Sequence, residues 1–151
     1  MANQYDPHIR QNLRLWLKLF KVGNAIEVTL QERLRHQCQT TLPRFDVMAA
    51  LDHHPRGLRM SELPRYLRVS NSNVIGIIER LAQDNLVERI RVNQDRRATQ
   101  TRLTHEGFAN FAATAHHHAV WVDELLGSLN ENEANQMVSL LQKIEPNNIG
   151  N

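Results

Sequence analysis

This sequence lacks cysteine pairs, membrane-spanning segments and export signals. A single cysteine, Cys38, cannot form an internal disulfide, and a lone thiol is compatible with a reducing compartment. No run approaches about eighteen apolar residues, and the polar start MANQYDPHIRQN lacks the pattern of a signal peptide. We therefore expect a cytoplasmic protein that does not bind a membrane.

Motifs for catalysis and for cofactors are also missing. The chain has no Gly-rich phosphate loop, no nucleophile elbow and no paired carboxylates at catalytic spacing. The sequence therefore predicts that the protein is not an enzyme and that it carries no cofactor.

Eight histidines raise the question of a metal site. Three of them, His116, His117 and His118, are consecutive, and adjacent residues of a helix point about 100° apart, so the three cannot all meet one ion. One of them could still join Cys38 or His36 in space. We assign no metal ligand, and a zinc- or redox-responsive protein stays an alternative.

Positive charge is concentrated in the middle of the chain. Residues 56–104 carry ten arginines against five acidic residues, a net charge of +5, whereas residues 105–151 carry Lys143 alone against six acidic residues. The net charge of the whole chain, +2, hides this difference. A basic segment of this kind indicates a polyanion partner.

Apolar residues at three- and four-residue steps predict long helices at both ends of the chain. The first runs from about Ile9 to about Leu34. Two more are predicted near the C-terminal end. One follows the capping residue Thr104, and the other follows Gly127 and Asn130 and ends near Ile144. The chain is therefore expected to be mainly α-helical.

The segment between these ends predicts three shorter helices. One follows the N-cap Thr41 and stops at Pro55, a second runs from the cap Ser61 through Leu67, and a third follows Ser70. Two short helices joined by a tight turn, the second with small polar residues at its start, are typical of a helix-turn-helix.

A β-hairpin is predicted directly after the third of these helices. Asn85 takes the left-handed position that ends the helix, and residues 86–92 and 99–104 are rich in strand-forming side chains. Residues 58–60 could add a short strand. A basic hairpin after a helix-turn-helix is the wing of a winged helix.

The helix that follows Ser70 is the candidate for the major groove, which is wide enough for one helix. Its candidate DNA contacts lie off the buried stripe, near the start: Asn71, Ser72, Asn73, Ile75, Gly76 and Arg80. Glycine costs about 1 kcal/mol relative to alanine inside a helix. Close approach of Gly76 to DNA or to a neighbouring helix would explain it, and incidental tolerance is the alternative.

The hairpin loop VNQDRRATQT carries an acid and two arginines, Asp95, Arg96 and Arg97. A narrow minor groove favours an inserted arginine, and Asp95 could hold one of the two guanidiniums by a bidentate pair. A solvated turn with a weak ion pair is the alternative.

Three stretches together resemble the MarR family of transcriptional regulators: TTLPRFDVMAAL, MSELPRYLRVSNSNVIGIIERLAQDNLVER and DRRATQTRLTHEG. The resemblance spans about Leu13 to Leu141. It implies a mainly α fold with a small β-hairpin wing, and a homodimer whose first and last helices intertwine. The partner would be double-stranded DNA with a palindromic operator, and the protein a repressor that a small effector releases.

The resemblance also divides the chain. Residues 1–151 would form a single unit, with a winged helix-turn-helix lobe at 42–104 and a helical dimerisation region at 8–38 plus 105–145. The wing departs from the family pattern, because Val92, Asn93 and Gln94 stand where many members have an Asp-Pro pair and a further arginine. The wing contact would then depend on Arg96 or Arg97 alone.

A narrower resemblance concerns the effector. SNSN with Gly76, TTLPRFD and AVWVDELL are similar to members that control aromatic-acid breakdown, some of which sense aromatic acyl-CoA thioesters. A pocket of the family type would lie between the dimer helices and the lobe. Its candidate residues are Arg14, Trp16, Phe20, Arg44, Phe45, Met48 and Phe111.

Other interpretations remain open. The aromatic residues at these positions could simply pack in a core or a subunit interface. A helical interaction module or an RNA-binding winged helix is the competing function.

Overall fold

The computed structural model describes residues 6–67, 71–92 and 99–145. The predicted cap Ser70, the wing tip and Pro146 lie outside these residues. In chain order the elements are α1 (Pro7–Cys38), α2 (Leu42–Asp52), the 3-10 helix η1 (Leu63–Arg65), α3 (Asn71–Gln83), β1 (Val87–Arg91), β2 (Thr99–Leu103), α4 (His105–Leu126) and α5 (Glu131–Gln142). The mainly helical fold with one antiparallel hairpin is therefore confirmed.

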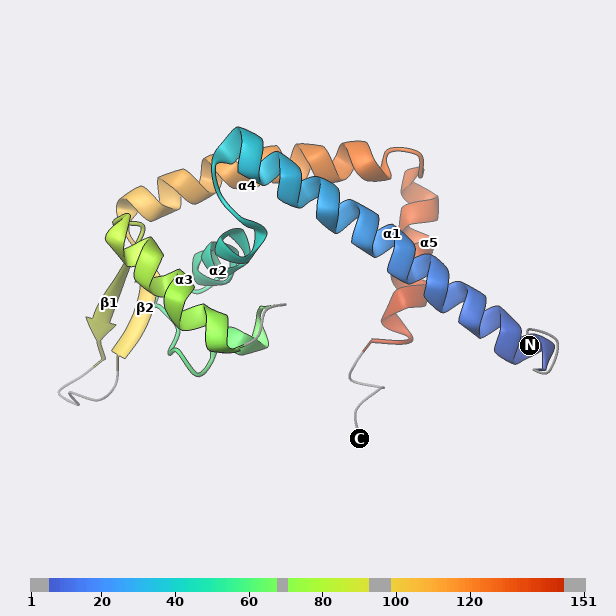
Figure 1. The fold of residues 1–151 in the computed structure, drawn as a ribbon, viewed down its shortest axis with the longest axis horizontal. Coiled ribbons are helices and arrows are strands. Elements are labelled where there is room, and N and C mark those ends of the chain that lie inside the picture. Colours follow the sequence, from blue (N-terminus) through green and yellow to red (C-terminus); the bar gives the residue numbers. More distant parts are fainter. Residues whose placement is uncertain (1–5, 68–70, 93–98, 146–151) are drawn as a thin grey trace.

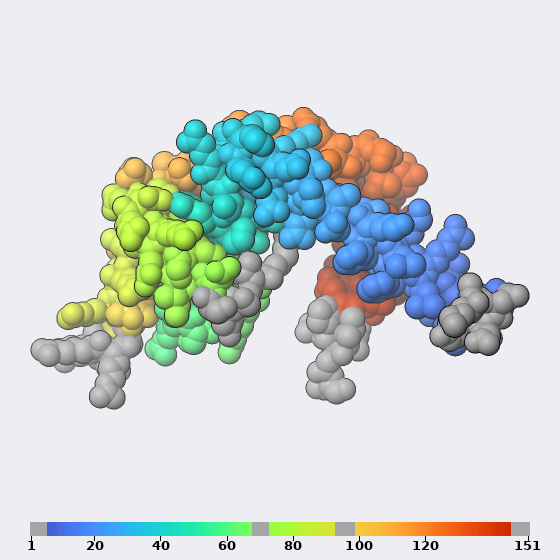
Figure 2. Space-filling view, viewed as in Figure 1, coloured from blue at the N-terminus to red at the C-terminus, as the bar shows by residue number. Residues whose placement is uncertain are grey.

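The elements form an arch (Figures 1 and 2). α4 and the C-terminal half of α1 run along its top, and a lobe made of α2, η1, α3 and the hairpin hangs from one end (Figure 1). α5 and the N-terminal half of α1 make up the other end. Within the described part of the chain, every helix is too short or too polar to span a membrane.

Three predicted helix-end signals are confirmed. The hydroxyl of Thr41 accepts a hydrogen bond from the Arg44 backbone N–H at 3.4 Å, and that of Thr104 accepts one from the Gly107 N–H at 2.9 Å. Asn85 has a φ of 59°, the left-handed conformation that ends a helix. These signals act over a few residues, so they can be read from sequence alone.

The helix predicted from Ser61 through Leu67 is wrong. Only the single 3-10 turn of η1 forms, and the Glu62 carboxylate accepts the Arg59 backbone N–H at 2.7 Å. Pro64 lacks an N–H, so it cannot add a bond to the turn. The sequence is thus held as a tight turn rather than as a helix of two turns.

The hairpin is shorter than predicted. Its register pairs Val87 with Leu103 and Arg91 with Thr99, and the predicted short strand at 58–60 is reduced to one bridge between Leu58 and Thr101. That bridge consists of two backbone hydrogen bonds, of 2.9 and 2.8 Å. It fastens the segment before η1 to the hairpin.

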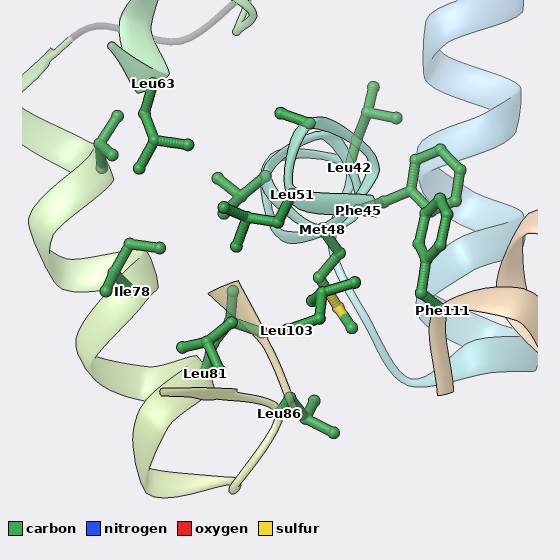
Figure 3. Packing of buried hydrophobic residues seen from close by; sticks show 14 of the residues in the cluster. Leu42, Phe45, Met48, Leu51, Leu63, Ile78, Leu81, Leu86, Leu103 and Phe111 are labelled. Atoms are coloured by element: carbon green, nitrogen blue, oxygen red, sulfur yellow. The ribbon is translucent and has the colours of Figure 1, made fainter. Parts of the chain in front are cut away.

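The core of the lobe lies between α2, α3, the hairpin and α4 (Figure 3). Leu51, Ile78 and Leu81 are fully buried in it, and each such side chain contributes about 1.5–3 kcal/mol. Phe45 on α2 and Phe111 on α4 meet at its edge, with ring centroids 5.4 Å apart. This packing fixes which face of α3 points away from the protein.

Candidate nucleic-acid interface

α3 has one buried face and one open face. Val74, Ile78 and Leu81 are at most 2% exposed, whereas Ile75 is 54% exposed although it is apolar. Asn73, Gly76 and Arg80 are also exposed, so the described side chains of the predicted contact set share the open face. Asn71 and Ser72 form the first turn of α3, and their side chains lie outside the described part of the structure.

Gly76 borders open space. A Cβ atom built on this residue meets no atom within 4 Å, so no neighbouring helix of the chain requires the glycine. The explanation by close packing inside the chain is therefore excluded. Two explanations of Gly76 remain: another molecule, such as DNA, approaches the helix closely at this position, or the glycine is tolerated there without a function.

The hairpin lies beside α3. β1 ends and β2 begins on the same side of the lobe as the N-terminal end of α3 (Figure 1). Arg89 and Arg91 are exposed on β1, and Glu88 forms an ion pair with Arg102 across the two strands at 2.7 Å. The predicted wing residues Asp95, Arg96 and Arg97 lie outside the described residues.

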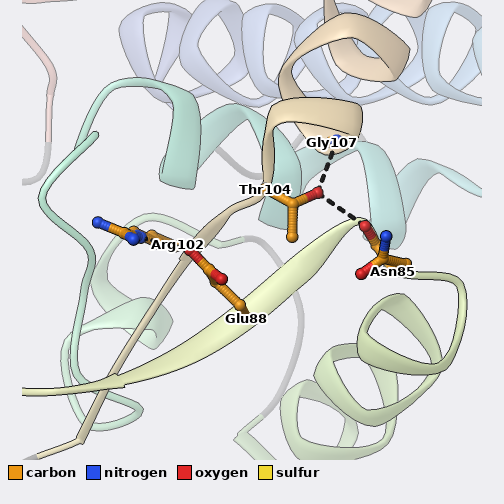
Figure 4. A network of polar contacts seen from close by, with 5 residues as sticks. All are labelled: Asn85, Glu88, Arg102, Thr104 and Gly107. Carbon is orange, nitrogen blue, oxygen red and sulfur yellow. Dashed lines mark hydrogen bonds and ion pairs between the residues drawn. The ribbon is translucent and has the colours of Figure 1, made fainter.

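A polar junction holds the C-terminal end of α3 against the start of α4 (Figure 4). The Thr104 hydroxyl donates to the Asn85 carbonyl at 2.7 Å, and the Thr104 N–H donates to the Leu86 carbonyl at 3.0 Å. The Asn85 side chain donates to Glu106 at 3.1 Å. A Cβ on Gly107 would lie 1.9 Å from the Leu86 oxygen, so only glycine allows this approach. The junction was not predicted, because it joins residues that are about twenty positions apart.

The predicted effector residues fall into two groups. Phe45, Met48 and Phe111 are buried in the core of the lobe, at 4–8% exposure. Trp16 and Phe20 are each 60% exposed on α1, where their rings stack at 5.7 Å, and Arg14 is exposed on the same helix. The N-terminal half of α1 lies well away from α2 (Figure 1), so a single chain does not bring the two groups together.

An apolar cavity does exist elsewhere. It has a volume of about 440 Å³ and lies between α1, α4 and α5. Val22, Ile26, Leu125, Leu129 and Met137 are among its lining residues, and none of the predicted effector residues is.

Arg44 has a partner that the sequence did not suggest. Its Nη2 atom lies 2.6 Å from Oδ2 of Asp84, the residue that follows α3. This ion pair joins the first turn of α2 to the end of α3.

Among the described residues, no group of three or more His, Cys, Asp or Glu side chains is placed to hold a metal ion. The ring of His118 stacks on Phe45 at 4.5 Å, and that of His117 stacks on Trp121 at 5.7 Å. Burial raises the pKa of the Cys38 thiol, and a hydrogen bond with Thr114 opposes this in part. A reactive thiolate would need the opposite shift.

Comparisons with known proteins agree with one another in finding transcriptional regulators. Residues 40–99 match the model of the MarR family. The HTH-type transcriptional regulator PecS of Dickeya dadantii is 28% identical over 109 residues, which are 71% of this chain and 66% of PecS. The match therefore spans slightly less than two thirds of that relative.

Solved structures resemble the chain over nearly its whole length. A MarR family transcriptional regulator from Silicibacter pomeroyi has 27% identity and a TM-score of 0.78, covering 93% of this chain and 96% of its own. A MarR variant from E. coli, solved with operator DNA, has 23% identity and a TM-score of 0.76, covering 94% of this chain and 100% of its own. The similarity to the E. coli protein is evidence for the fold alone.

Proposed function

The chain belongs to the MarR family of transcriptional regulators, and we propose that it acts as a homodimeric repressor of a palindromic operator that a small effector releases. One observation carries the DNA-binding part of this proposal. The open face of α3 presents Ile75, Asn73 and Arg80 beside a basic hairpin, in a fold that E. coli MarR uses with operator DNA.

The contacts follow from the chemistry of the grooves. Asn73 suits an adenine edge, Ile75 a thymine methyl group, and Arg80 a guanine or a phosphate. We assign Asn71 and Ser72 to the same helix end, and Asp95, Arg96 and Arg97 to a wing over the minor groove. Residues 42–104 are then the DNA-binding lobe.

Exposed apolar surface supports a dimer. Leu13, Trp16, Leu17 and Phe20 on α1 are 48–60% exposed, and α5 buries none of its residues against its own chain. Contiguous apolar surface of this kind marks an interface. Residues 8–38 plus 105–145 are thus assigned to dimerisation, and α1 would place two recognition helices on one operator.

The effector acts through the spacing of those helices. A fitting dimer places its recognition helices about 34 Å apart, in successive major grooves. An effector that binds a wrongly spaced conformer shifts the population away from DNA. Trp16 and Phe20 are exposed, and the N-terminal half of α1 lies away from α2 (Figure 1), which supports a site that is completed only in the dimer.

Selection from a random duplex library tests the DNA-binding proposal. We expect a two-fold symmetric consensus whose half-sites lie about 10 base pairs apart, bound with an affinity that falls steeply as salt rises. Sedimentation should give a dimer. Equal affinity for random and selected duplexes, without salt dependence, would overturn the proposal, and a preference for RNA would favour the competing class.

Titration of the operator complex tests the effector. Aromatic acids and their CoA thioesters are expected to release the DNA, and zinc serves as the control. Release by zinc alone would replace the aromatic effector with a metal-responsive mechanism.

A further inference from the structure

Two charged residues lie at the helix ends that disfavour them. Arg44 is in the first turn of α2, where the helix dipole is positive, and Asp84 follows the last residue of α3, where the dipole is negative. Each charge is locally unfavourable. An unfavourable interaction of this kind with the helix dipole is usually offset by a favourable contact elsewhere in the structure.

The gain is the contact between them. The ion pair is 2.6 Å long, and the two side chains are 24% and 53% exposed. The Nε atom of Arg44 is buried and has no hydrogen-bond partner among the described residues. The pair places the carboxylate of Asp84 near the positive N-terminal end of α2 and the guanidinium of Arg44 near the negative C-terminal end of α3, and both placements are favourable.

This contact completes the hold on the C-terminal end of α3. Asn85 and Leu86 are fixed by Thr104 and Glu106 at the start of α4. Asp84 is fixed by α2. The end of the helix is thus tied to two elements at once, and its opposite end is the one assigned to the DNA groove (Figure 1).

We propose that Arg44 and Asp84 are positioning residues that set the angle of α3 in the lobe and thereby its discrimination between base pairs. This inference rests on the proposed function, and it gives Arg44 a role other than effector binding. Neither residue needs to touch DNA. Base-edge hydrogen bonds depend on alignment, whereas attraction to phosphates tolerates small rotations. Losing the pair should therefore lower specificity more than non-specific affinity.

The chain offers a matched control. Arg33 and Glu124 form an ion pair of the same 2.6 Å length with similar exposures, 30% and 56%, but it joins α1 to α4. Asp84→Asn and Glu124→Gln each remove one carboxylate charge without changing the size of the side chain. Both variants therefore change the net charge of the chain by the same amount.

The measurement is the ratio of affinities for the selected duplex and for a random duplex, by fluorescence anisotropy on the full chain. We expect Asp84→Asn to lower the ratio about five-fold, as for the loss of one partly exposed pair, and Glu124→Gln to leave it unchanged. The salt dependence should stay the same, because the phosphate contacts are kept. Equal ratios for the two variants would overturn the proposal.

A double-mutant cycle separates positioning from general damage. Arg44→Met keeps the apolar stem, and the Arg44→Met/Asp84→Asn double variant should lose no more specificity than Asp84→Asn alone. Additive losses would mean that the residues act independently, which contradicts the proposal. A wild-type chain without preference for any duplex would instead refute the proposed function, and this assignment with it.

Discussion

Replacing Gly76 by alanine should make the protein more stable and a poorer DNA binder. The two effects have different sources. Alanine is favoured over glycine in an exposed helix interior by about 1 kcal/mol, and the new Cβ meets no atom of the chain within 4 Å. The full gain in helix propensity is therefore available, and it corresponds to a rise in Tm of about 2–4 °C for a chain of this size.

The DNA effect follows from the same open space. If the backbone of α3 at Gly76 approaches base edges, a methyl group there displaces neighbouring contacts such as that of Ile75. Losing one base contact costs about 1–3 kcal/mol. We expect a loss of about ten-fold in affinity for the selected duplex, equal to about 1.4 kcal/mol.

Urea denaturation and fluorescence anisotropy measure the two effects on the same preparations. Gly23→Ala is the control, because a Cβ at Gly23 in α1 also meets no atom within 4 Å. It should stabilise the protein to a similar extent and leave DNA affinity unchanged. Because Gly23 lies in the region assigned to dimerisation, sedimentation of both variants first establishes that the dimer is retained. An unchanged or raised DNA affinity in Gly76→Ala would mean that the glycine is incidental and that the helix does not come close to DNA at this point.

Two further predictions concern the fold and the thiol. Gly107→Ala should destabilise the protein by about 3 kcal/mol in urea denaturation, because its Cβ would lie 1.9 Å from the Leu86 carbonyl, a backbone atom that cannot give way; unchanged stability would contradict the observed approach. Because burial raises the pKa of Cys38, its reaction with a disulfide reagent should follow a pH profile whose midpoint lies above that of an unfolded control in urea. A midpoint at or below the control would show an activated thiol and revive the redox alternative.

Helix ends could be predicted where the signal is local. Thr41, Thr104 and Asn85 act on backbone groups within three residues of themselves, so the sequence alone identifies them. Ser61 failed although it is a good cap, because the Glu62 carboxylate takes the N–H of Arg59 and closes a tight turn instead. A cap residue shows that a turn starts nearby, but competition with neighbouring side chains decides its length.

The effector residues could not be sorted from sequence, because an aromatic side chain serves a pocket and a core equally well. Phe45 and Phe111 contact each other inside the lobe, whereas Trp16 lies open on α1. Arg44 is paired with a residue forty positions away, a contact that neither helix indicates by itself. Contacts between residues that are far apart in the sequence decide the role of a side chain. The periodicity of apolar residues predicts only the face of the helix on which that side chain lies.

Gly76 and Gly107 show how far that limit extends. Both are helical glycines, and for each the sequence alone predicts only a cost in stability relative to alanine. The structure assigns them opposite surroundings, since a Cβ at Gly107 would collide with backbone and a Cβ at Gly76 would meet nothing. The cost at Gly107 is therefore offset inside the chain, by the junction with Leu86. The cost at Gly76 has no such compensation, so any gain must come from a partner that approaches the open face of α3.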